Sequence, residues 1–436
     1  MYFQPRLELE LDYVENIDLV KSGGRSDWIA QLNPGFDLAI DSPGAAVFVE
    51  YQLQTLNHQD LSEFDDEYHQ VNGSAELRWI ENALTQNIFV NRTQQVVSFD
   101  RPGGYNQLTN SNNLTDSTVY GTQMYWTSLP SGKLQTELSV GAFRVDEEVD
   151  SNSLLYSFEV SPYRSEGRFS WSITSNYRVV DYETGLDATH SQSEFEVDFA
   201  LTDLLSIVAS VGYDKDVSRS VFRSSSERGD SNSVGFNWQP KGQAEISVRY
   251  EQHYYGDYFS GEFSIPLNRL ELNIETGQEV VSGSDLSRDN IFDPTGILQS
   301  LVGIDTAQVF TNDFFKGSAR YVYPRGFLNL ALVVEDRSTE LELFGVEQEE
   351  TFETVTFEWF HKLNRRLSVS TRIDYDEREL RDGVRYDELF STVELSYEPR
   401  PGLTFRVFSG FGNGSSDADV FDYLSRVFGA GLIIEL

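Results

Sequence analysis

Histidine and carboxylate side chains that could bind a metal ion occur together in one short stretch of the sequence. His58 and His69 flank a segment, residues 60–67, that is rich in Asp and Glu. Imidazole and carboxylate groups in such proximity could hold a divalent cation. A run of charged residues is more often a solvated loop, and we favour that interpretation here.

A second acidic stretch, NGSSDADVFD from Asn413 to Asp422, carries carboxylates of the kind that bind Ca²⁺. It lacks the full spacing of an EF-hand loop, so an acidic surface loop is again favoured. His253 and His361 each fall in a strand-like stretch, but no Ser or Asp partner for a hydrolytic site can be identified. We therefore expect no catalytic residue, no metal site, no cofactor and no enzyme activity.

The composition of the chain excludes several classes of protein. The 436 residues carry a formal net charge of −37 and include no cysteine, which excludes disulfides and thiolate metal sites. A chain this acidic should repel the phosphates of nucleic acids. No apolar run approaches the roughly 20 residues of a membrane helix. Aromatic residues make up 13% of the chain, too many for an acidic disordered protein.

Apolar and polar residues alternate along most of the chain. In RLELELDY, residues 6–13, leucines alternate with carboxylates, and SEFEVDFALT, residues 193–202, has the same pattern. Side chains of a β-strand point alternately to its two faces, so each stretch predicts a strand with one apolar and one polar face.

Turn residues separate these stretches at regular intervals. Most turn signals lie about 35–40 residues apart, the length of one hairpin with a longer loop at its far end. The signals are centred on Pro43, Asn82, Gly132, Gly167, Asp203, Pro240, Asn268, Pro324, Asn364 and Pro399.

Short turns at one end and long polar loops at the other are typical of outer-membrane barrels. We predict an all-β fold, a transmembrane antiparallel up-and-down barrel of about 22 strands, with about 16–24 as the plausible range. The barrel forms a single domain, residues 1–436. A soluble sandwich or propeller is the alternative, since alternation alone does not exclude it.

The chain ends on a strand-length stretch, YLSRVFGAGLIIEL, whose two alternating sets of residues differ sharply in polarity and size. Its apolar phase, expected to face lipid, comprises Phe428, Leu432, Ile434 and Leu436. The other phase holds small residues such as Gly431, where a change to Ser should be mild. A closed barrel leaves no free edge, so this last strand should pair with the first.

The polar phases predict a lumen with an excess of carboxylates. A ring of carboxylates in an aqueous path favours cations over anions, although cross-strand pairs with arginine could instead stabilise the wall. The expected lumen-lining acids are Glu8, Glu10, Asp12, Glu194, Glu196, Asp198, Glu245, Glu251, Glu271, Glu275, Asp374 and Asp376.

One segment, residues 283–308, breaks the alternation. Its DPTGILQSLVGI stretch has helical spacing, with Asp293 as a helix cap and Pro294 in the first turn. It is expected either to constrict the lumen or to form an extracellular loop with a short helix.

Residues 10–95 resemble a known family. Tyr13, Asn16, Leu19, Ser26-Asp27, Asn33-Pro34-Gly35 and Tyr51 resemble the outer-membrane β-barrels associated with PEP-CTERM and exopolysaccharide gene systems. The resemblance implies a porin-like barrel in the bacterial outer membrane, encoded near polysaccharide-export or protein-sorting genes. The terminal strand also resembles the signal read by the barrel-insertion machinery, which usually ends in Phe where this chain has Leu436.

These observations lead to an expected location and function. The chain opens without a basic start or an apolar leader, so we expect a mature sequence whose signal peptide has been removed. The first functional hypothesis is a channel moving material across the outer membrane, and the second is a structural barrel that docks a partner. Expected partners are outer-membrane lipid and lipopolysaccharide, the insertion machinery and an export-system or plug protein, with no nucleic acid.

Overall fold

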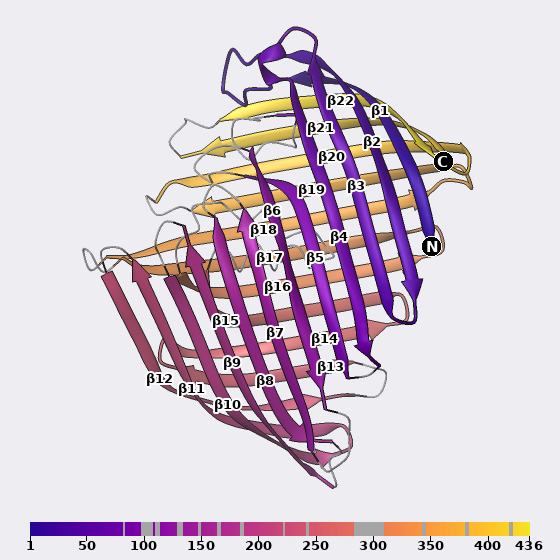
Figure 1. Ribbon diagram of the computed structural model, residues 1–436. Coiled ribbons are helices and arrows are strands. Elements are labelled where there is room, and N and C mark those ends of the chain that lie inside the picture. Colours follow the sequence, from indigo (N-terminus) through magenta and orange to yellow (C-terminus); the bar gives the residue numbers. More distant parts are fainter. Residues whose placement is uncertain are drawn as a thin grey trace.

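The computed structural model shows a closed barrel of 22 antiparallel strands (Figure 1). Each strand pairs with its neighbours in the sequence, and the first pairs with the last, so the predicted fold class, strand number and strand order are confirmed. The structure describes residues 1–81, 83–96, 108–109, 114–128, 134–146, 150–163, 167–183, 187–220, 223–240, 244–282, 309–341, 346–379, 383–417 and 422–436. The segment 283–308, for which a constriction or loop was predicted, lies outside these residues.

The elements follow one another in simple order. They are β1 (Tyr2–Glu15), β2 (Asp27–Ser42), β3 (Ala45–His58), the 3-10 helix η1 (Ser62–Phe64), β4 (Asp66–Ile80), β5 (Leu84–Val96), β6 (Leu114–Thr127), β7 (Leu134–Asp146), β8 (Ser151–Pro162), β9 (Phe169–Tyr182), β10 (Asp187–Thr202), β11 (Leu205–Ser220), β12 (Arg223–Trp238), β13 (Glu245–His253), β14 (Gly256–Leu267), β15 (Leu270–Ser282), β16 (Val309–Tyr323), β17 (Gly326–Leu341), β18 (Val346–Lys362), β19 (Leu367–Glu379), β20 (Arg385–Arg400), β21 (Leu403–Ser416) and β22 (Tyr423–Glu435). Among the described residues, no helix is long and apolar enough to cross a membrane.

The predicted turns fall at one end of the barrel, at every second connection from β2–β3 to β20–β21. The backbone explains some of the residue choices. Asn268, between β14 and β15, has a φ of 26°, and Gly402, between β20 and β21, has a φ of 79°. Few residues other than Gly and Asn adopt such angles readily, which is why they mark turns. The turn predicted at Pro399 lies slightly before the observed turn, because β20 continues to Arg400.

The two ends of the chain close the barrel. Leu9 lies opposite Leu432 and Asp12 lies opposite Gly429 in the β1–β22 ladder. The backbone N–H of Leu436 donates to the carbonyl oxygen of Pro5 at 3.0 Å, so the ladder continues to the last residue. The apolar C-terminus is therefore a strand that completes the wall.

Residues directly opposite one another in a ladder share a face, so the register assigns every strand an outer and an inner side. On the outer side, Leu11 is 49% exposed and Phe428 is 48% exposed. On the inner side, Asp12 and Val14 are fully buried. Leu432 shares the outer side with Leu9, as the register requires. Contact of this apolar outer side with lipid stays a prediction.

Glycines on β22 make room for large side chains on the inner face. A Cβ at Gly429 would overlap the carboxylate of Asp12 and the ring of Phe408. A Cβ at Gly431 would lie 2.9 Å from Nε of Arg406, a residue held in place by Glu8 and Glu10. That Gly431→Ser is mild stays a prediction, although the added side chain would displace Arg406 from this position.

We predict that Gly429→Ala destabilises the barrel. Asp12 is fully buried and cannot move into solvent, so relieving the overlap should cost about 1–3 kcal/mol of unfolding free energy. Urea unfolding of the lipid-reconstituted protein, followed by tryptophan fluorescence, measures this change. Gly44→Ala is the control, because its Cβ would have no atom within 4 Å. Equal stability of the two variants would contradict the proposed packing at the closing seam.

Candidate functional site

The inner face of the barrel is the candidate site, and the register places all twelve predicted lumen acids on it. Contacts that skip a strand identify this face as the concave one. Arg406 on β21 contacts Glu8 and Glu10 on β1 across β22, a reach that the diverging side chains of a convex surface could not make. The acids are Glu8, Glu10, Asp12, Glu194, Glu196, Asp198, Glu245, Glu251, Glu271, Glu275, Asp374 and Asp376.

The acids of β1 belong to a buried cluster at the closing seam. Arg406 pairs with both Glu8 and Glu10, and Nε2 of Gln31 donates to Oδ2 of Asp12 at 2.6 Å. A second amide, Nε2 of Gln52, donates to Oε2 of Glu8 at 3.0 Å. These carboxylates stabilise the wall and are poorly placed to meet a passing solute.

A second group of acids, on β10 to β15, has fewer basic neighbours. Arg249 on β13 donates from Nη1 to Oε2 of Glu196 at 2.6 Å. Glu262 lies directly opposite Glu275, an unfavourable arrangement of like charges, and the nearest cation in the register is Lys316 of β16, opposite Glu275. Neither Glu262 nor Glu194 forms an ion pair within 4 Å with a cation in the described part of the chain.

The acids of β17 to β20, in contrast, are interleaved with arginine. Nη2 of Arg378 donates to Oε2 of Glu388 at 2.7 Å, and Nη2 of Arg337 donates to Oε2 of Glu335 at 2.7 Å. Asp374 accepts from Nε of Arg372 at 2.8 Å. The inner face therefore has a paired sector over β17 to β20 and an acidic sector over β10 to β15.

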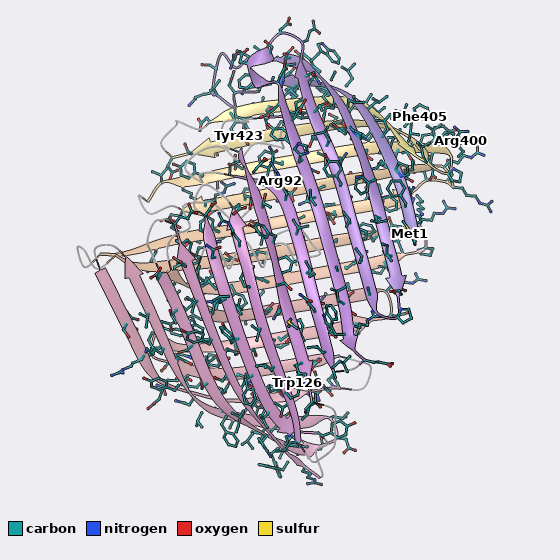
Figure 2. The ribbon with its side chains drawn as sticks, in the orientation of Figure 1. Met1, Arg92, Trp126, Arg400, Phe405 and Tyr423 are labelled. Atoms are coloured by element: carbon teal, nitrogen blue, oxygen red, sulfur yellow. The ribbon has the colours of Figure 1, made fainter. Side chains whose placement is uncertain are left out.

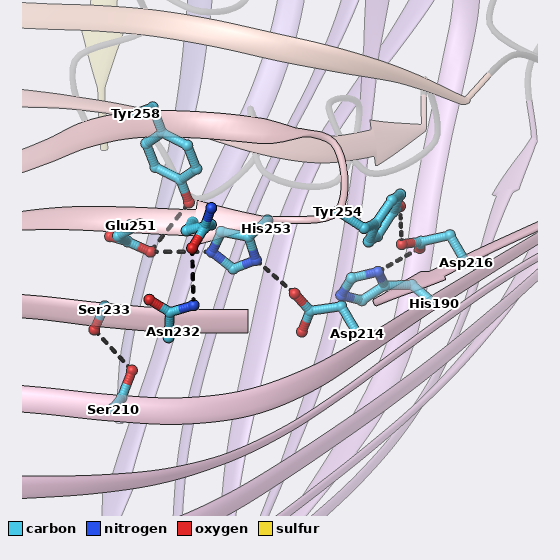
Figure 3. A network of polar contacts seen from close by, with 11 residues as sticks. His190, Ser210, Asp214, Asp216, Asn232, Ser233, Glu251, His253, Tyr254 and Tyr258 are labelled. Carbon is cyan, nitrogen blue, oxygen red and sulfur yellow. Dashed lines mark hydrogen bonds and ion pairs between the residues drawn. The ribbon is translucent and has the colours of Figure 1, made fainter. Parts of the chain in front are cut away.

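A network around His253 was not predicted from the sequence (Figure 3). Nδ1 of His253 lies 2.5 Å from Oδ2 of Asp214, and Nε2 lies 3.3 Å from Oε2 of Glu251. Carboxylate oxygens accept hydrogen bonds, so the geometry fits an imidazolium that donates from both nitrogens. The hydroxyl of Tyr258 donates to the same oxygen of Glu251 at 3.1 Å. The partner Asp214 alternates with Asp216 on the polar phase of β11, which is the signal that could have revealed it.

The same network ties the short β13–β14 hairpin to β11, two strands along the wall from β13. Tyr254, in the turn of this hairpin, donates to Asp216, which also lies 2.5 Å from Nδ1 of His190. Beside it, Nη2 of Arg178 on β9 donates to the carbonyl oxygen of Val280 on β15 at 3.2 Å. Strands far apart in the ladder therefore touch, and the interior is narrow in this sector.

At the long-loop end, apolar side chains fill part of the barrel mouth. Ile17 and Leu108, from two loops, pack with Val14, Ile29 and other buried residues of the surrounding strands. Arg25 holds the β1–β2 loop against η1, because its guanidinium donates to Asp18 of the same loop at 2.6 Å and to Glu63 of η1 at 2.5 Å.

The histidines and acids first considered as a metal site do not come together. His58 is 9% exposed, and its Nδ1 lies 3.6 Å from Oδ1 of Asp65. His69 instead shares a hydrogen bond of 2.9 Å with the hydroxyl of Tyr51. Of the stretch from Asn413 to Asp422, residues 418–421 lie outside the described part of the chain.

Comparisons with known proteins identify the fold. No protein-family model and no curated protein matches the sequence. The FrpB iron transporter from Neisseria meningitidis (F5-1 variant) is 10% identical with a TM-score of 0.58, over 100% of this chain and 82% of that one. The siderophore receptor PirA from Acinetobacter baumannii is 7% identical with a TM-score of 0.53, over 99% and 80% of the two chains. At this identity the similarity establishes a shared barrel fold.

We predict that the fastening of the mouth loops depends on pH. The hydrogen bond from Arg25 lowers the pKa of Asp18 below its ordinary value of 3.8. The carboxylate therefore stabilises the folded loop above that value, and this contribution is lost as the pH falls through the lowered pKa. Arg25→Gln should increase local opening of residues 17–25 several-fold at pH 7, as measured by hydrogen exchange.

Once the pH has fallen below the lowered pKa of Asp18, the opening of wild type and Arg25→Gln should converge. Arg168→Gln, at the opposite end of the barrel, is the control and should leave the loop unchanged. A difference between wild type and Arg25→Gln that is as large at low pH as at pH 7 would exclude the Asp18 carboxylate as the fastening group.

Proposed function

We propose that this chain is a bacterial outer-membrane channel that passes neutral or cationic solutes in preference to anions. The observation that carries the proposal is the acidic sector of the inner face over β10 to β15, where Glu194, Glu262 and Glu275 face the interior. Carboxylates lining an aqueous path attract cations and repel anions. In this proposal the chain lets solutes pass through its lumen and catalyses no reaction.

The barrel itself supports an outer-membrane location. Its outer side is apolar, its short turns lie at one end, and its fold is shared with the FrpB transporter. A closed barrel satisfies every backbone hydrogen bond of the wall, which lipid requires. In this proposal the short turns face the periplasm, the outer side contacts lipid and lipopolysaccharide, and the terminal strand ending at Leu436 is read by the barrel-insertion machinery.

The sequence resemblance in residues 10–95 suggests the biological setting. It favours a barrel that works beside a PEP-CTERM or exopolysaccharide system, with an export component as its partner. The acidic sector restricts the cargo in this setting. A strongly anionic polymer would be repelled by Glu194 and Glu262, so a neutral or cationic polymer fits better.

A docking barrel is the second candidate, and the contacts across the interior favour it. The hydrogen bond from Arg178 on β9 to the carbonyl oxygen of Val280 on β15 narrows one sector, and apolar loops fill part of the mouth. Transporter barrels of 22 strands commonly hold a plug in the lumen. In this alternative the inner face binds a partner or plug segment and conducts nothing.

Ion selectivity distinguishes the two candidates. In a planar bilayer, the channel should conduct and should pass K⁺ in preference to Cl⁻ at 0.1 M salt. The preference should weaken at 1 M, because the Debye length falls from about 10 Å to about 3 Å. The double variant Glu194→Gln, Asp198→Asn should reduce the preference, because it removes two negative charges from the inner face. It leaves the ion pair of Glu196 with Arg249 intact.

The matched control removes the same charge away from the inner face. Glu353→Gln and Asp203→Asn lie on the outer side of β18 and in the β10–β11 turn, and they should leave the selectivity unchanged. Equal selectivity shifts for the two double variants would contradict a role for the acidic sector. A silent bilayer would reject the channel in favour of the docking barrel.

A further inference from the structure

Basic side chains gather on one part of the rim formed by the short turns. They lie in, or at the strand end next to, four successive connections, β14–β15, β16–β17, β18–β19 and β20–β21, and all are exposed. We call these residues the basic crescent: Arg269, Arg325, Lys362, Arg365, Arg366 and Arg400. Figure 2 shows Arg400 at the end of the barrel where Met1 lies. A positive patch on a chain of net charge −37 is a marked departure from its average surface.

The positive charges of the basic crescent are not neutralised by acidic side chains in the described part of the protein. No ion pair within 4 Å joins them to a carboxylate of the described residues, whereas Arg378, Arg372 and Arg406 inside the barrel are all paired. Two carboxylates lie near the crescent: Glu398 at the end of β20, and Glu435, whose backbone N–H donates to the carbonyl oxygen of Gly402. The cations are therefore available to an external anion.

The position of the basic crescent argues against lipid headgroups as its occupant. Phospholipid would surround the whole circumference, yet the described turns on the other side of the rim carry the acids Asp41, Glu81 and Asp203. Arg168, at the β8–β9 turn, is a cation outside the crescent. A discrete anionic partner matches a charge confined to one sector better than a continuous lipid ring does.

The spacing of the turns indicates the shape of that partner. Neighbouring hairpins of a tilted barrel lie about 12 Å apart along the rim. An extended chain covers that distance in about four residues, so about a dozen residues would span the four turns. Acidic side chains at every third or fourth position would then meet each turn in succession.

We infer that the basic crescent docks an extended acidic segment of a periplasmic protein. The partner's location rests on the proposed orientation in the outer membrane, but the charge complementarity does not depend on conduction. The binding is electrostatic and exposed, so it should be fast and strongly dependent on salt. The crescent thus supplies a docking surface at the rim formed by the short turns.

The test uses the full chain in lipid nanodiscs and a labelled sixteen-residue peptide with Glu at every fourth position, separated by Ser and Gly. Fluorescence anisotropy at low salt should show binding of this peptide and not of its Gln counterpart. The variant Arg325→Glu, Arg366→Glu should weaken binding at least tenfold. The control Lys215→Glu, Arg228→Glu makes the same charge change on exposed residues of β11 and β12 near the long-loop end, and should bind as wild type does.

The lipid of the nanodisc separates the two sources of anion. Equal peptide affinity in phosphatidylcholine and phosphatidylglycerol discs supports a protein partner. Loss of peptide binding in phosphatidylglycerol discs would overturn the inference and assign the basic crescent to lipid headgroups. Absence of binding by wild type, or equal weakening in both variants, would also overturn it. Conductance is not the readout, so a failure here is distinguishable from a failure of the channel proposal.

Discussion

The structure depends on one constraint: every backbone hydrogen bond of the wall must be made between strands. Twenty-two strands meet it by forming a ring, which the pairing of β1 with β22 completes. An open edge in lipid would leave several N–H and C=O groups without partners, each costing several kcal/mol. This requirement explains why the β1–β22 ladder is hydrogen-bonded as far as Leu436.

Curvature of the wall determines the chemistry of the interior. On the concave face, side chains from strands that are not neighbours come within contact, as Arg406 does with Glu8 across β22. Small residues such as Gly429 and Gly431 provide the space for these contacts. The ion pairs of the paired sector stabilise the wall, whereas the acidic sector over β10 to β15 presents carboxylates to the interior. The proposed selectivity depends on the second sector and the stability of the barrel on the first.

Much of the fold could be predicted because it follows from local patterns. Turn residues at every second connection indicate the number of strands. Period-two alternation indicates on which face of its strand each predicted acid lies, including Glu194 and Asp376. Alternation could have marked Asp214 as an inward-facing carboxylate, but its pairing with His253 was missed, because the contact joins β13 to β11 over a long separation in sequence. The crowding at Gly431 was missed for the same reason: Arg406 fills that space from β21, and its ion pairs reach across β22 to β1. Alternation assigns a residue to a face, but contacts across that face depend on the closed shape.

The central claim is that the register places one face of every strand in lipid and the other in the lumen. The chain has no cysteine, so single cysteines can be introduced and labelled along β10. Electron paramagnetic resonance of spin labels in lipid vesicles measures access to oxygen, which is enriched in lipid, and to a water-soluble nickel complex. Labels at 195, 197 and 199 should favour oxygen, and labels at 194 and 196 should favour the nickel complex. Accessibilities without a period of two, or with the opposite phase, would contradict this account.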